Sequence, residues 1–122
     1  MQNENERNDL SERLLNFASE IIKLAVRLNK TGVERHIAGQ LTRSGTSTGA
    51  NYEEACGAES RADFIHKLQI VLKELRESSY WLRLIRKTGF ISVTDPNLSA
   101  LLREDEELTK IIAKSIVTAR KR

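Results

Sequence analysis

The feature that most constrains the fold is a regular spacing of apolar residues near the start of the chain. Large apolar residues recur at alternating intervals of four and three positions, at Leu10, Leu14, Phe17, Ile21, Leu24 and Leu28. This spacing places one apolar stripe along an α-helix, whereas a half-buried strand would alternate at every second residue. It predicts a helix over about 9–29, opened by Asp9 and Glu12 as a capping box and ended near Gly32.

A stripe with the same spacing predicts a helix over about 61–88. Ser60 and Asp63 form its expected capping box, and Gly89 ends it. The stripe consists of Phe64, Leu68, Val71, Leu75, Ser78, Leu82 and Ile85, and Ile65 and Leu72 widen it. Such a broad apolar face is typical of a bundle helix rather than of a two-stranded coiled coil.

The last helix is predicted over about 96–120, because Asp95 can cap it and Pro96 suits its first position. Its core residues are expected to be Leu98, Leu101, Leu102, Leu108, Ile111, Ile112 and Ile116. In the loop that precedes it, we expect Phe90, Ile91 and Val93 to tuck under the end of the bundle.

The segment over about 33–56 has a weaker helical pattern. Its apolar stripe gives way to small and polar residues, and it contains Gly39, Gly45 and Gly49, each of which costs about 1 kcal/mol relative to alanine in a helix. This segment can be helical only if neighbouring helices hold it. The Gly45-xxx-Gly49 spacing would let another backbone approach closely, either within the bundle or from a second subunit.

Four such segments joined by short loops predict an all-α fold, an antiparallel up-down-up-down four-helix bundle, with residues 1–122 as one domain. Aromatic residues make up only 5% of the chain and there is one proline, which is unlike a β-sandwich or barrel. The polar, acidic N-terminus lacks the apolar stretch of a signal peptide, and no run of about 18 apolar residues could cross a membrane. We therefore expect a cytoplasmic protein without membrane contact.

Three features of the sequence resemble catalytic or metal-binding sites, and each lacks a required part or has a simpler explanation. Gly45-Thr46-Ser47-Thr48-Gly49 matches the nucleophile elbow of hydrolases, but no alternating strand precedes Ser47 and only His66 lies downstream. Carboxylates at Glu74 and Glu77 could face a bundle core, yet no Glu-x-x-His pair typical of di-iron bundles occurs. The single cysteine, Cys56, is expected to be a packing residue. We therefore predict no enzyme activity, no cofactor and no metal.

The basic residues form a more informative pattern. The net charge is +3 and the pI is near 9.2, with a net of −1 over residues 1–61 and +4 over 62–122. The predicted topology brings six cationic side chains to one end of the bundle: Arg27, Lys30, Arg35, Arg83, Arg86 and Lys87. Such a cluster can bind nucleic-acid phosphates. Equally, cations near helix C-termini offset the helix dipoles.

Three sequence segments carry a resemblance to a known family. They are Gln40-Leu41-x-Arg43-Ser44-x-x-Ser47-x-x-x-Asn51-x-x-Glu54, then Asp63-Phe64-x-x-Lys67-Leu68, and then Lys73-Glu74-x-x-Glu77-x-x-Tyr80-Trp81-Leu82. The combination resembles the bacterial four-helix-bundle proteins first noticed inside intervening sequences of large-subunit ribosomal RNA genes. The resemblance implies that the glycine-rich second segment is helical and that the bundle assembles as a ring, often a homopentamer. It also implies a polar signature that joins the second and third helices: Arg43, Ser47, Asn51, Glu54, Glu74 and Glu77.

A related branch of that family resembles the accessory variability protein of diversity-generating retroelements, a basic pentamer that binds a reverse transcriptase and nucleic acid. From the charge pattern and this resemblance, we expect a non-enzymatic, homo-oligomeric adaptor that associates with RNA or DNA and assists a reverse transcriptase or another RNA-linked process. The alternative is a protein–protein scaffold that binds no nucleic acid and whose charges serve only solubility.

Overall fold

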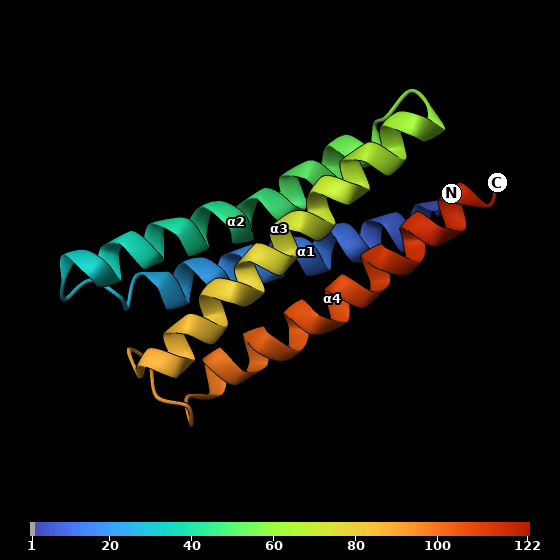
Figure 1. The fold of residues 1–122 in the computed structure, drawn as a ribbon. Helices are drawn as coiled ribbons and strands as arrows, with labels where there is room; N and C mark the ends of the chain where they lie inside the picture. The colour runs from blue at the N-terminus through green and yellow to red at the C-terminus, as the bar shows by residue number, and fades with distance from the viewer. Residues whose placement is uncertain (1) are drawn as a thin grey trace.

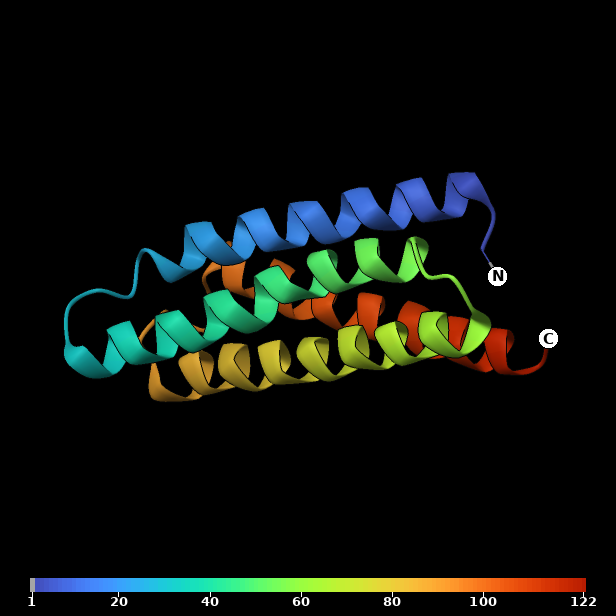
Figure 2. The ribbon, with the colours of Figure 1, turned by 90° about the horizontal axis from the view of Figure 1, so that it is seen from above.

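The computed structural model describes residues 2–122 as four consecutive helices, α1 (Glu4–Ala25), α2 (Gly32–Cys56), α3 (Arg61–Thr88) and α4 (Pro96–Arg120). They run alternately up and down, so that both termini lie at the same end of the bundle (Figure 1). Each helix packs against the next one in the chain, α4 also packs against α1, and α1 and α3 lie on the diagonal (Figure 2). The predicted all-α, antiparallel four-helix bundle is confirmed.

The core is built from the apolar stripes that the sequence spacing predicts. Every stripe residue predicted for α1 and α3 is buried, including Leu14, Ile21, Leu68 and Leu75, which are each 0% exposed. In α4 the predicted core residues divide into two groups. Five are buried, whereas Leu102 and Ile111 are half-buried and cover the core from the side.

The first helix begins earlier than predicted. Its N-cap is Asn3, whose Oδ1 accepts a hydrogen bond from the Glu6 backbone N–H at 2.9 Å, while its amide donates to the Glu6 carboxylate at 3.0 Å. This pair caps the helix before Asp9 is reached, so the prediction that Asp9 opens it was wrong. Asp9 lies exposed inside α1.

The turn between α1 and α2 also differs from the prediction. The first helix ends at Ala25, and Gly32 is the first residue of α2 rather than the residue that stops α1. The cause is Thr31, whose hydroxyl accepts a hydrogen bond from the Glu34 backbone N–H at 3.1 Å and so caps α2. Leu28 remains buried although it lies outside the helix.

The caps predicted for the other two helices are confirmed. Ser60 caps α3 through the Asp63 backbone N–H, and Gly89 ends α3 with φ of 74°, a left-handed conformation that suits glycine. Asp95 caps α4, with Pro96 at its first position. In the loop between them only Ile91 is buried. The prediction that Phe90 and Val93 also tuck under the bundle was wrong, since they are 38% and 64% exposed.

The glycine-rich segment is helical throughout, and close contact with α1 explains Gly45. A Cβ atom placed on Gly45 would lie 2.8 Å from the Ile21 Cγ2 atom, so only glycine fits at this crossing. One turn later, a Cβ on Gly49 would lie 3.5 Å from Leu14 Cβ, an ordinary contact. The close backbone approach that the glycine spacing predicts therefore occurs within the bundle, between α2 and α1.

Candidate functional site

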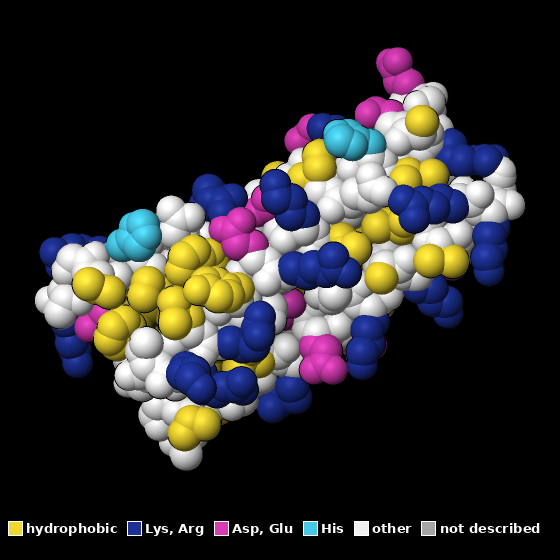
Figure 3. Space-filling model, viewed as in Figure 1, with side chains coloured by type: hydrophobic (Ala, Val, Ile, Leu, Met, Phe, Trp, Pro, Cys, Tyr) yellow, Lys and Arg dark blue, Asp and Glu magenta, His cyan; other side chains and the backbone are white. Residues whose placement is uncertain are grey.

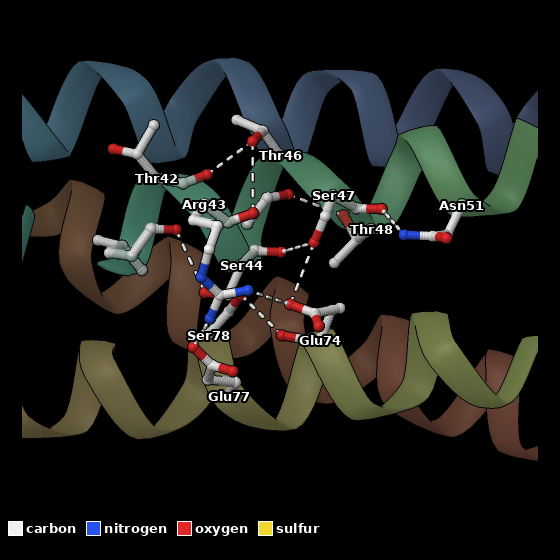
Figure 4. Close-up of polar contacts among 12 residues, drawn as sticks. Thr42, Arg43, Ser44, Thr46, Ser47, Thr48, Asn51, Glu74, Glu77 and Ser78 are labelled. Atoms are coloured by element: carbon white, nitrogen blue, oxygen red, sulfur yellow. Dashed lines mark hydrogen bonds and ion pairs between the residues drawn. The ribbon is translucent and has the colours of Figure 1, made fainter. Parts of the chain in front are cut away.

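A chain of polar contacts joins α2 to α3 near the middle of the bundle (Figure 4). The Arg43 guanidinium donates to Glu74 Oε2 at 3.2 Å and also to the Glu77 carboxylate. The Ser47 hydroxyl donates to the same Glu74 oxygen at 3.1 Å. Below them the Ser78 hydroxyl donates to the Ser44 hydroxyl at 3.0 Å inside the core. These contacts hold two helices in register.

Two members of the predicted polar signature lie outside this network. The Asn51 amide donates to the Ser47 carbonyl at 2.9 Å, within α2. Glu54 forms an ion pair with Lys67 of α3 at 2.9 Å, near the other end of the helix pair. The structure therefore joins the side chains of Arg43, Ser47, Glu74 and Glu77, while Asn51 contacts only the backbone of Ser47 and Glu54 pairs elsewhere.

Glu77 also holds the aromatic pair of α3. The Trp81 indole N–H donates to Glu77 Oε2 at 3.1 Å, and this bond, followed by the Arg43 contact, lowers the pKa of Glu77. Trp81 is half-buried against the core, and its ring meets Tyr80 edge to face with centroids 5.1 Å apart. Glu77 therefore links a contact within α3, from Trp81, to a contact between helices, from Arg43 of α2.

The serine of the elbow-like motif occupies no hydrolase geometry. Ser47 lies in the interior of α2, not in a turn between a strand and a helix. His66 is exposed on α3, as is His36 on α2. Over residues 2–122, no group of three histidine, cysteine or acidic side chains is arranged to hold a metal ion. Within the same residues, no helix is both long and apolar enough to cross a bilayer.

The six cations expected to gather at one end of the bundle take different surroundings. Arg27 forms a two-bond ion pair with Asp95, with N–O distances of 2.6 and 3.2 Å, and this contact lowers the pKa of Asp95 to about 2. Arg35 donates to the Asn29 carbonyl at 3.1 Å. Lys30 and Lys87 are exposed. Arg83 and Arg86, by contrast, line a groove.

This groove runs between α3 and α4 and has a volume of about 900 Å³. Lys and Arg side chains gather along this seam in the space-filling view, with few acidic side chains among them (Figure 3). Five cationic side chains line it: Arg76, Arg83 and Arg86 of α3, and Arg103 and Lys110 of α4. Of these five, within residues 2–122, only Lys110 forms an ion pair, an exposed contact with Glu106 at 3.4 Å. The other four form no ion pair within these residues, and Arg83 Nε donates to the Ser79 carbonyl at 3.3 Å.

A buried carboxyl group also borders the groove. Asp105 is only 2% exposed, because it occupies a core position of α4 between Leu101 and Leu108. Its Oδ1 accepts a long hydrogen bond of 3.3 Å from the Thr109 hydroxyl, and its Oδ2 has no hydrogen-bond partner within the described chain. Burial raises the pKa of Asp105 to about 7, against the opposing effects of Thr109 and Arg83.

Inspection of the sequence alone missed this residue. The intervals of three and four along α4 run Leu98, Leu101, position 105, Leu108 and Ile112, so the stripe itself places position 105 in the core. The predicted core omits Asp105, and an ionisable residue is rarely fully buried without a partner. The sequence signal that could have identified Asp105 is an ionisable residue at a position where the apolar stripe requires a core residue.

Comparisons with known proteins agree with this fold. Residues 6–114 match the sequence profile described as 23S rRNA-intervening sequence protein. The structure is similar to a crystal structure of a protein of unknown function from the S23 ribosomal protein family of Bacteroides thetaiotaomicron, with 38% sequence identity and a TM-score of 0.82. The match covers 90% of this chain and 96% of that one. A search of the curated proteins finds no match.

Proposed function

Because the chain belongs to the 23S rRNA-intervening sequence protein family, whose function is unknown, we propose from its surface that it is a non-enzymatic adaptor that binds nucleic acid through the α3–α4 groove. The observation that carries this proposal is the row of unpaired arginines along the groove. Arg76, Arg83 and Arg86 lie on one face of α3, and Arg103 faces them from α4.

The length of this row suits a phosphate backbone. Arg76 and Arg86 are ten residues apart on one helix, a distance of about 15 Å along its axis. With about 3.4 Å of rise per nucleotide, such a span matches roughly four phosphates of one strand. Arginine and lysine would make charge-assisted contacts there without reading base sequence.

Self-association would strengthen this attraction. A ring requires two different, complementary patches on each subunit. The outward face of α1 exposes Leu15, Ile22 and Val26 by 62%, 45% and 66%. Apolar side chains also gather over α2 and α3 near the α1–α2 turn (Figure 3). Among the apolar residues of these two helices, Val33 and Tyr80 are 61% and 50% exposed.

Neither apolar patch includes a residue that lines the groove. We propose a homopentamer, as the family resemblance implies. Five subunits of net charge +3 would carry about +15, which is enough to attract a polyanion at low salt.

The binding experiment is fluorescence anisotropy of labelled RNA and DNA over a salt series. We expect the logarithm of the binding constant to fall linearly with the logarithm of the salt concentration. The double variant Arg83→Glu with Arg86→Glu should weaken binding to oligonucleotides of any base sequence. It should also reduce the slope of log affinity against log salt concentration by about two. The matched control is Lys30→Glu with Arg35→Glu, which changes the net charge equally at exposed positions outside the groove.

Equal losses in both double variants would mean that binding follows net charge or the end of the bundle rather than the groove. If a correctly assembled wild-type protein bound neither nucleic acid at low salt, the adaptor proposal would fail. The exposed apolar patches would then favour a protein–protein scaffold as the function.

Assembly is tested separately by sedimentation velocity. Leu15→Glu with Val26→Glu should convert the oligomer to monomers, because each change places a charge in the proposed α1 contact. Val117→Glu is the control, since Val117 is 51% exposed on α4, outside both patches. A wild-type protein that sediments as a monomer at micromolar concentration would rule out the ring.

A further inference from the structure

We propose that Asp105 couples binding in the α3–α4 groove to proton uptake, so that the groove holds a polyanion more tightly when this carboxyl group is protonated. The inference rests on the proposed function, and it adds regulation by pH to the same site.

The geometry leaves the charged form of Asp105 poorly compensated. The side chain lines the groove but is 2% exposed, so water reaches it very little. One oxygen has the 3.3 Å bond from Thr109 and the other has no hydrogen-bond partner within residues 2–122. A buried carboxylate with so few donors favours taking up a proton.

Charges around Asp105 come from the two helices that pack against α4 and from α4 itself. From α3 the groove receives Arg76, Arg83 and Arg86, and from α4 it receives Arg103, Glu106 and Lys110. From α1, Arg13 approaches α4 but is held by Glu104 through two hydrogen bonds of 2.7 and 3.1 Å. The cations that oppose protonation of Asp105 are thus those offered to a ligand, and Arg83 is the one that acts on its pKa.

A bound polyanion therefore competes with Asp105 for the same positive charge. Phosphates paired with Arg83 would remove its support for the carboxylate and add negative charge nearby. Both effects raise the pKa of Asp105 beyond its value of about 7 in the free protein. By linkage, a ligand that raises this pKa binds more tightly at low pH, because binding then retains or takes up the proton.

The size of the effect follows from the two pKa values. If the bound phosphates raise the pKa from about 7 to about 8, affinity should be roughly fivefold higher at pH 6 than at pH 8. Asp105→Asn imitates the protonated state and cannot titrate. This variant should bind at pH 8 about as tightly as the wild type binds at pH 6. Its affinity should lack the part of the pH dependence that arises from Asp105.

The experiment measures anisotropy of one labelled oligonucleotide without terminal phosphates at pH 6, 7 and 8 and constant ionic strength. Its phosphodiesters stay ionised over this range, so the ligand does not titrate. Wild type and Asp105→Asn share His36 and His66, which are exposed and do not line the groove, so the difference between the two proteins isolates Asp105.

Glu106→Gln is the matched control. It removes the same charge from the same groove, but Glu106 is exposed whereas Asp105 is buried. We expect this variant to bind slightly more tightly at every pH and to keep the wild-type pH dependence. If instead Asp105→Asn keeps that dependence while binding strongly, the coupling is wrong and the nucleic-acid proposal stands. Absence of binding in all three proteins would overturn both.

Discussion

Replacing Asp105 by asparagine should stabilise the protein, and the gain should grow as the pH rises. Asparagine has nearly the same shape but carries no charge, so the variant removes the burden of a buried carboxylate while keeping a polar group near Thr109. A gain from a core substitution is unusual, since most of them destabilise a protein.

The magnitude follows from the pKa of Asp105, which rises from 3.8 in an exposed carboxyl group to about 7 in the folded chain. Above pH 7 both the folded and the unfolded chains carry the charge, and the folded state bears the full penalty. Between pH 4 and 7 only the folded state holds the proton, so stability falls as the pH rises through this window. The penalty relieved by the variant is about 4 kcal/mol at pH 8 and less than about 1 kcal/mol at pH 4.

Urea unfolding followed by far-ultraviolet circular dichroism at pH 4, 6 and 8 measures this difference directly. The control is again Glu106→Gln, because Glu106 is exposed and its single ion pair with Lys110 has little energetic value. A gain for Asp105→Asn that is the same at pH 4 and pH 8, or a loss at pH 8, would refute the reasoning. It would mean that the carboxylate is well solvated or paired in the folded protein.

Two further predictions concern the packing of α2. Gly45→Ala should lower the free energy of unfolding by about 1–3 kcal/mol, because its Cβ would overlap Ile21, whereas Gly39→Ala, with nothing within 4 Å, should raise it by up to about 1 kcal/mol. Equal effects in denaturant titrations would contradict the close crossing of α1 and α2. Cys56 should react with iodoacetamide more slowly than a free thiol at pH 8, because burial raises the pKa of its thiol. Mass spectrometry of samples taken at timed intervals measures the rate of this reaction. A rate equal to that of glutathione would show that the thiol is accessible to solvent.

The contacts that specify the functional surface depend on pairs of residues far apart in the chain. Arg27 and Arg83 look alike in the sequence, since both lie between the last two residues of an apolar stripe. Only the packed bundle shows that Arg27 is held by Asp95 while Arg83 lines an open groove. Helix caps show a similar limit at the N-terminus, where Asn3 and Asp9 were both chemically able to cap and the structure uses Asn3.

By itself, the sequence determined the number and order of the helices, their antiparallel arrangement and most of the core that α1, α3 and α4 contribute, because an apolar stripe of helical period must be buried and short loops leave few ways to bury it. It also carried the family membership. Only the tertiary structure decided which partner faces each polar side chain: Gly45 meets Ile21 of α1, Arg43 reaches Glu74 of α3, and Asp105 lies without a full set of donors beside a groove of arginines. Periodicity determines which face of a helix turns inward. The axial register and rotation of the helices, set by packing over the whole bundle, determine what that face meets.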